Sequence, residues 1–292
     1  MKVNIDIKNK INNKNSNYNL NGNLVKDFKI IDTHVHMGKY SSSFVNTSYD
    51  DLAIKTIIGL NFKKIIVTHT SFFLDPEIGI KETIKIIKKN KDFIYGYVVY
   101  NPNHIEKSIK IIEEFFNKNN TNTISKNIVG IKMHPEEHQC SITDPGYENL
   151  WKIASEKDIP ILSHTWNPNV ANKNQKFADA LFFEKVATVY PGLKVILGHA
   201  GAKDYYYYEV IKMIKRCINK NIFVDLAGDI FYSGMIELFV KEIGSERVLF
   251  GTDIPWCDPL YQIINIINSN ISDKDRENIF FNNATGIFKF ES

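Results

Sequence analysis

Eight histidines are present in the chain, and the spacing of two of them gives the first indication of chemistry. His34 and His36 belong to the segment IDTHVH at positions 31–36. Because side chains alternate faces along a strand, both imidazoles would point the same way, with Asp32 one step deeper on that face. Two imidazoles so placed can bind one metal ion at about 2.0–2.1 Å. An isolated His-x-His is more often two unrelated side chains, so a metal site requires further ligands.

Further candidate ligands follow three other apolar runs. His164 ends the string PILSH, His199 the string VILGH, and Asp253 the string VLFGTD. A charged aspartate beside a buried run needs a compensating partner, and a metal ion is a natural one. Each residue alone also fits a structural role, such as a core histidine or a helix cap. Together with the His-x-His pair, they favour a metal site.

The elements that must position these residues alternate along the chain. Continuous runs of Ile, Val, Leu and Phe are typical of strands covered on both faces in a parallel sheet. The predicted strands are Lys29–Thr33, Lys64–Thr68, Phe93–Val99, Ile128–Met133, Ile159–Ser163, Leu193–Leu197, Ile222–Leu226 and Arg247–Gly251. The predicted helices are Glu77–Asn90, Ile105–Asn117, Phe177–Tyr190, Glu209–Asn219 and, after a Ser-x-x-Asp start, Ser272–Phe290.

Eight strand–helix units predict a closed (β/α)₈ TIM barrel, which is an α/β fold. We expect a single domain over residues 24–292 that ends in a C-terminal helix, preceded by a polar extension over residues 1–23. Seven of the eight histidines lie at or shortly after the carboxyl end of a predicted strand. Those ends converge on one mouth of a barrel, where active sites are built.

Composition excludes several function classes. The net charge of +3 argues against a general attraction to nucleic acid or to an acidic membrane. The three cysteines form no CxxC pair, so neither a disulfide framework nor a structural zinc knot is expected, and a reducing cytoplasm fits. No apolar run approaches the roughly 18 residues of a membrane span. We therefore expect a cytoplasmic protein whose partner is a small molecule.

The order of the candidate ligands resembles that of the amidohydrolase superfamily of metal-dependent barrels. The local strings are most similar to its amidohydrolase-related branch, which includes aminocarboxymuconate semialdehyde decarboxylase. The matching strings are DTHVH at 32–36, GIKMHP at 130–135, LGHAG at 197–201, GTDIPW at 251–256 and NATGIF at 283–288. The resemblance covers nearly the whole chain after about Asn23 and is specific for the superfamily rather than for one reaction.

The resemblance implies one divalent metal ion per chain, bound by His34, His36, His164 and Asp253. Zn²⁺ is expected, with Mn²⁺ or Co²⁺ as alternatives. Such an ion lowers the pKa of bound water to about 7. Asp253 would then be both a ligand and a catalytic proton acceptor. The family pattern makes His199 the second catalytic residue, which stabilises charge in the transition state.

Lys132 is the ambiguous position. Some relatives carry a carboxylated lysine near the end of this strand that bridges two metals, whereas a charged lysine would hold an anionic substrate group. A salt-bridged structural lysine is the third interpretation. Because Met133-His134-Pro135 follows it, we expect an unmodified ammonium at the pocket wall. His134, His69, Trp166 and Trp256 complete the predicted substrate-binding residues.

These residues support three hypotheses. The leading one is a metal-dependent hydrolase that cleaves an amide, ester or lactone bond of a small molecule through metal-activated water. The second is a non-oxidative decarboxylase of a small carboxylic acid that uses the same metal site, and the third is a non-catalytic metal-binding or ligand-binding barrel. Of the four consecutive tyrosines at 205–208, some must face outward, where they could form a homodimer contact.

Overall fold

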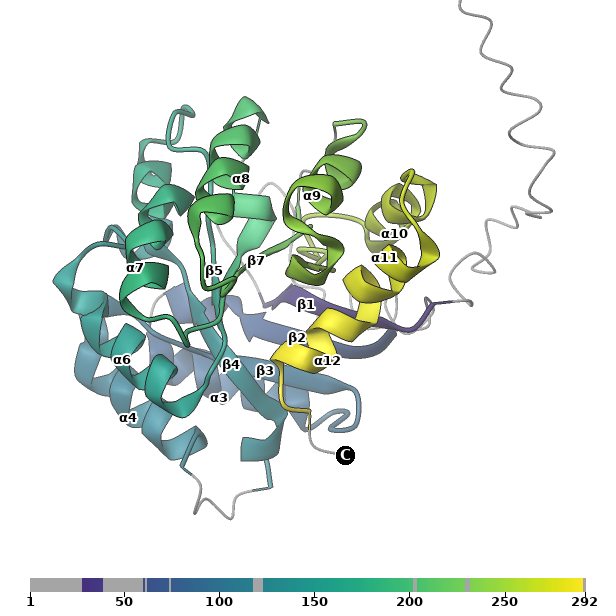
Figure 1. The fold of residues 1–292 in the computed structure, drawn as a ribbon. Coiled ribbons are helices and arrows are strands. Elements are labelled where there is room, and N and C mark those ends of the chain that lie inside the picture. Colours follow the sequence, from purple (N-terminus) through teal and green to yellow (C-terminus); the bar gives the residue numbers. More distant parts are fainter. Residues whose placement is uncertain are drawn as a thin grey trace, which may run out of the picture.

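The computed structural model describes residues 28–38, 60, 62–73, 75–117, 123–201, 204–228 and 232–290. The predicted extension over residues 1–23 lies outside these ranges. Eight parallel strands follow one another around a sheet in the order of the sequence, and helices surround them (Figure 1). The predicted (β/α)₈ barrel is confirmed. The strands are β1 Ile30–Met37, β2 Phe62–His69, β3 Ile94–Val99, β4 Ile128–Met133, β5 Ile161–Ser163, β6 Val195–Leu197, β7 Ile222–Asp225 and β8 Val248–Leu249.

The ring closes between β1 and the segment that follows β8. The backbone N–H of Thr33 donates to the carbonyl of Phe250 at 3.1 Å, and that of His36 donates to Ile254 at 2.8 Å. In return, the N–H of Asp253 donates to the carbonyl of His34 at 2.9 Å. This exchange fixes the segment that carries Asp253 directly beside the histidines of β1.

The barrel interior is filled below the mouth by apolar side chains. All eight strands contribute to one buried or partly buried group: Ile31, Ile66, Tyr95, Tyr97, Val129, Leu162, Ile196, Phe223 and Leu249. Ala284, Ile287 and Phe288, at the C-terminal end of the chain, pack into the same group. A larger core lies between the strands and the surrounding helices. Layers of side chains fill such a barrel, so polar chemistry is left to its mouth.

The described helices are four to twelve residues long, and most of them cover the outer face. They are α3 Pro76–Ile87, α4 Ile105–Phe115, α5 Pro135–His138, α6 Glu148–Lys157, α7 Phe183–Val189, α8 Tyr207–Arg216, α9 Met235–Ile243, α10 Pro259–Asn268, α11 Asp273–Glu277 and α12 Asn283–Ile287. None of the described helices is long and apolar enough to cross a membrane. In the tyrosine run, Tyr206 and Tyr207 are buried whereas Tyr205 and Tyr208 are exposed, and the homodimer contact stays a prediction.

Two predicted helices differ in detail. The helix expected over Phe177–Tyr190 begins only at Phe183, because two 3₁₀ segments come first and the Asp179 side chain caps the second by accepting from the N–H of Leu181. The helix expected from Ser272 starts there with a capping box, as predicted. It is not uniform, however, because a π-helical turn over Asn278–Asn282 separates α11 from α12.

Candidate functional site

His34 and His36 share one face of β1, as the strand period predicts. Their Nε2 atoms lie 3.2 Å apart. Oδ1 of Asp253 is 3.7 Å from Nε2 of His34 and 3.5 Å from Nε2 of His36. Both imidazoles are buried. Three ligand atoms from two ends of the chain therefore converge on one point at the barrel mouth.

A buried carboxylate that the sequence analysis did not single out orients His34. Asp225 is the last residue of β7 and is fully buried, and its Oδ2 lies 2.8 Å from Nδ1 of His34. Its Oδ1 accepts from the backbone N–H of His199 at 2.8 Å and from that of Ala227 at 3.1 Å. With Nδ1–H donated to Asp225, the lone pair on Nε2 of His34 faces His36 and Asp253.

The sequence held a signal for Asp225. Asp225 lies within the apolar run IFVDL, much as Asp253 directly follows the run VLFGT. A carboxylate in a buried strand requires a partner. Asp32, by contrast, is committed to the barrel wall: its Oδ2 accepts from Thr252 Oγ1 at 2.6 Å, and its Oδ1 accepts from the N–H groups of His34 and Thr252. Burial raises the pKa of Asp32 to about 7.

His199 occupies a strained turn after β6. Its φ of 60° and that of Ala200, 54°, lie in the left-handed region that side chains other than glycine rarely adopt. A Cβ at position 228 would lie 2.5 Å from Nδ1 of His199, which is too close. The ring therefore packs directly against Gly228, a position that has no room for a side chain. The strain and the close packing hold the His199 ring 5.0 Å from that of His34, centroid to centroid.

His164, the fourth predicted ligand, lies beside His199 rather than inside the first cluster. Its Nδ1 is 3.2 Å from Nε2 of His199, and its Nε2 is 3.2 Å from Oε1 of Gln175. His134, Glu136 and His164 form a second group of side chains whose ligand atoms all lie within 4.8 Å of one another. The structure thus brings His34, His36 and Asp253 into one group and His164 into a neighbouring one.

Lys132 lies beneath the cluster, in the strand β4. It is fully buried, and its Nζ is 2.8 Å from Nε2 of His34. Burial lowers the pKa of this ammonium to about 8, while the charges of Asp225 and Asp253 act in the opposite direction. The side chain was expected at the pocket wall, but it is not among the described residues that line the cavity, because the ring of His34 is its immediate neighbour.

A cavity of about 280 Å³ opens above these residues. Its described lining comprises His36, Phe73, His134, Glu136, Glu137, His164, Trp166, Gln175, His199, Asp253 and Trp256. Trp166 lies edge-on to His199 at 5.1 Å and Trp256 edge-on to His36 at 5.0 Å, so indole rings flank the polar centre. The predicted pocket residues His134, Trp166 and Trp256 therefore line the cavity.

His69 is not part of that described lining, because its Nδ1 lies 2.7 Å from Oγ of Ser71 in the turn after β2. Glu136, Glu137 and Gln175 line the cavity but were not predicted. The two glutamates follow the GIKMHP string directly, which was the available signal. Gln175 lies in a 3₁₀ segment of a long connection, Lys173–Ala178, where no periodicity marks it.

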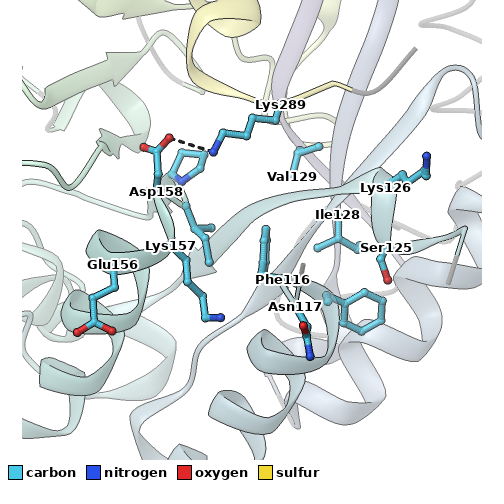
Figure 2. Close-up of a pocket in the computed structure, with 13 residues that line it drawn as sticks. Phe116, Asn117, Ser125, Lys126, Ile128, Val129, Glu156, Lys157, Asp158 and Lys289 are labelled. Atoms are coloured by element: carbon cyan, nitrogen blue, oxygen red, sulfur yellow. Dashed lines mark ion pairs between the residues drawn. The ribbon is translucent and has the colours of Figure 1, made fainter. Parts of the chain in front are cut away.

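A larger cavity, of about 710 Å³, lies at the other end of the strands (Figure 2). Ile128 at the start of β4 and Pro160 just before β5 contribute to its wall, and an ion pair of 3.0 Å joins Lys289 to Asp158 beside it. Neither group of ligand side chains found among the described residues borders this cavity. Size alone therefore does not locate the functional site.

The donor set fits a divalent cation. Ligand atoms that bind one tetrahedral ion at about 2.0–2.1 Å must lie about 3.3–3.4 Å from one another. The separations among Nε2 of His34, Nε2 of His36 and Oδ1 of Asp253 are 3.2, 3.5 and 3.7 Å. Burial holds the pKa of both imidazoles well below the ordinary value, so both rings are neutral and offer lone pairs.

A model of the Amidohydrolase family matches residues 81–290 of the chain. Gamma-resorcylate decarboxylase of Polaromonas sp. is 30% identical over 178 residues, which are 49% of this chain and 54% of that protein. Gamma-resorcylate decarboxylase of Rhodococcus jostii is 24% identical over 182 residues, which are 50% of this chain and 55% of that protein. The chain thus spans about half the length of these curated relatives.

Solved structures are similar over most of the chain. The 2,6-dihydroxybenzoate decarboxylase from Rhizobium has a TM-score of 0.68 at 15% identity, over 89% of this chain and 98% of that one. A dihydroxybenzoic acid decarboxylase from Polaromonas sp., with bound manganese and 2-nitroresorcinol, has a TM-score of 0.68 at 16% identity. The match covers 89% of this chain and 96% of that one. The 5-carboxyvanillate decarboxylase from Sphingomonas paucimobilis has a TM-score of 0.69 at 12% identity, over 89% of this chain and 99% of that one. At these identities the likeness shows a common fold.

The first prediction concerns His138, which is buried in α5 with its Nδ1 3.1 Å from the Tyr147 hydroxyl. Burial lowers its pKa to about 3, whereas an unfolded histidine has a pKa of about 6.5. Below a pH of about 6.5 this histidine binds a proton in the unfolded chain but not in the folded protein. The free energy of unfolding therefore falls as the pH falls.

The variant His138→Gln lacks this proton uptake. Between pH 7 and pH 5.5, urea unfolding should show the wild type losing about 1 kcal/mol more stability than the variant. Equal losses in the two proteins over this range would contradict the assignment of a buried, neutral His138.

Proposed function

Because this chain belongs to the amidohydrolase family, we propose that it is a divalent-metal-dependent, non-oxidative decarboxylase of a small aromatic carboxylic acid. The convergence of His34, His36 and Asp253 beneath a cavity flanked by indole rings carries the proposal. The decarboxylase alternative has support from the curated relatives, both of which are decarboxylases. Hydrolysis of an amide, ester or lactone, the leading expectation from the sequence, has no specific support among them.

His34, His36 and Asp253 would hold the ion, with His164 as the fourth ligand. A divalent ion bound there supplies a Lewis acid that polarises an oxygen of the substrate. Imidazole and carboxylate ligands suit both Zn²⁺ and Mn²⁺. The manganese in the Polaromonas dihydroxybenzoic acid decarboxylase favours Mn²⁺ as the first ion to test, and Zn²⁺, the expectation from the sequence, as the second.

Decarboxylation replaces a C–CO₂⁻ bond by a C–H bond, so one proton must reach the carbon that loses carbon dioxide. Asp253 is placed for this step: its Oδ1 faces His34 and His36, and its Oδ2 lies on the side of Gly228, against which His199 packs. We assign to Oδ2 the proton that is delivered to the ring carbon. His199, held by the strained turn, stabilises the charge that develops on the substrate.

The cavity supports a flat monocarboxylate as the substrate. A volume of about 280 Å³ accommodates one substituted ring, and Trp166, Trp256 and Phe73 offer aromatic surface to it. The described lining includes Glu136, Glu137 and Asp253 but neither lysine nor arginine. A second negative charge on the substrate would find no cation among those residues, so we expect dicarboxylates to be poor substrates.

The decarboxylase assignment predicts metal-dependent release of carbon dioxide from hydroxybenzoic acids. Dialysis against a strong chelator should abolish the activity, and Mn²⁺ or Zn²⁺ should restore it. Asp253→Asn should lower kcat at least about a hundredfold, because it removes the proton donor. Asp92→Asn, which changes an exposed acid, is the control and should leave kcat unchanged. Full activity after exhaustive chelation, or cleavage of lactones without any decarboxylation, would overturn the proposal.

A further prediction concerns Lys132. Its ammonium donates to the nitrogen of His34 that the ion needs, so Lys132 competes with the metal for that lone pair and also repels it. Lys132→Met should therefore tighten metal binding about tenfold or more, with one ion per chain before and after. A competition titration with a chromophoric chelator measures the affinity. Two ions in the wild type and loss of one in the variant would instead indicate a carboxylated lysine that bridges two metals.

A further inference from the structure

We propose that Gln175 and Glu136 are positioning residues that fix the ring of His164, so that its Nδ1 is presented to the centre of the site. The inference rests on the proposed role of His164 as a metal ligand. It concerns residues that neither the sequence pattern nor the family resemblance singles out. It also gives a role to Glu136, a member of the second group of ligand-type side chains that the proposed reaction does not otherwise use.

A chain of polar contacts runs from His164 toward the surface. Nε2 of His164 lies 3.2 Å from Oε1 of Gln175, a side chain that is 8% exposed. Burial raises the pKa of Glu136, and the neighbouring side-chain amide of Gln175 opposes that rise. Nδ2 of Asn172 donates to Oε1 of the same carboxylate. Because the carboxylate of Glu136 attracts the N–H groups of this amide, the amide oxygen faces His164.

The orientation of the amide selects one tautomer of His164. An amide oxygen only accepts, so the imidazole must carry its proton on Nε2, which leaves the lone pair on Nδ1. Nδ1 is the atom that lies 3.2 Å from Nε2 of His199, on the side of the candidate metal centre.

Packing also restricts how the His164 ring can move. The His134 ring stacks on that of His164 with centroids 4.1 Å apart and planes inclined by 7°, and Trp166 stacks at 5.9 Å and 9°. Parallel neighbours oppose tilting of the ring but not a half-turn about its bond to Cβ, which would exchange nitrogen for carbon at both sites. The hydrogen bond to Gln175 is the contact that distinguishes the two orientations.

The same geometry argues against a second metal at His134, Glu136 and His164. A metal ion binds imidazole nitrogen close to the plane of the ring. Two rings stacked in nearly parallel planes share no point that is in the plane of both, so they cannot both bind one ion well. Nε2 of His164 is moreover occupied by Gln175 and has Oε2 of Glu136 3.5 Å away. Partners of this kind are typical of histidines that bind metal through their other nitrogen.

The test compares substitutions along this chain of polar contacts in the protein with its whole sequence. Gln175→Met keeps the length of the side chain and removes the acceptor, so Mn²⁺ affinity should fall about 10–100-fold. Gln175→Glu should also weaken binding, because it places two carboxylates side by side. The exchange E136Q/Q175E should restore the affinity, since a carboxylate then accepts both from His164 and from an amide. Lys176→Met, an exposed position in the same 3₁₀ segment, is the control and should leave the affinity unchanged.

A second readout does not depend on metal. In the metal-free protein, ¹⁵N NMR of labelled histidines should show His164 protonated on Nε2 in the wild type and in the exchange variant. In Gln175→Met it should show a mixture of tautomers. A purely structural contribution of Gln175 would alter stability and leave the tautomer unchanged.

Two results would overturn the inference. The first is wild-type affinity and an unchanged tautomer in Gln175→Met. The second is two ions in the wild type with one lost in Glu136→Gln, which would make this group a metal site. Absence of any divalent metal binding in the wild type would overturn the proposed function instead, and the NMR comparison would still decide the role of Gln175.

Discussion

The hydrogen bond between Asp225 and His34 is the contact on which the rest of the site depends. A buried carboxylate is costly unless its oxygens are satisfied, and Asp225 accepts from the imidazole of His34 and from the N–H groups of His199 and Ala227. One side chain therefore joins β1, β7 and the turn after β6. It fixes which nitrogen of His34 faces the candidate metal centre. By accepting from the backbone N–H of His199, it also fixes the position of the turn that carries this residue.

The layered interior of the barrel favours this arrangement. Apolar residues from every strand fill the space below the mouth, so the carboxyl ends of the strands are the place where polar groups gather. Closure of the ring between β1 and the segment after β8 brings Asp253 to the histidines through backbone hydrogen bonds and the bonds of Thr252 to Asp32. Asp225 behind His34 and Gln175 behind His164 then use the same principle, in which a partner on one ring nitrogen directs the other.

Much of this could be predicted from the sequence because the signals were local. Short apolar runs, most of them continuous, marked all eight strands, and the period of two placed His34 and His36 on one face. Asp253 was found because it follows a buried run. Asp225 was missed although the signal was similar, since an acid at the last residue of a strand resembles a boundary more than a site.

Other features depend on packing across the barrel, which spacing does not encode. The spacing on β4 puts Lys132 and His134 on one face but does not give their depth, so Lys132 was expected at the wall and lies instead against His34. Gln175 comes from an irregular connection and reaches His164 only through the tertiary fold. His69 follows a strand end as the other candidates do, yet it turns to Ser71.

The most direct test of the account is the metal affinity of Asp225→Asn. The amide keeps the size of the side chain but cannot accept at both positions, so the ring of His34 loses its fixed orientation. The account predicts that Mn²⁺ binds about 10–100-fold more weakly, while circular dichroism shows an intact barrel. An affinity equal to that of the wild type in a correctly folded variant would contradict the claim that Asp225 organises the site.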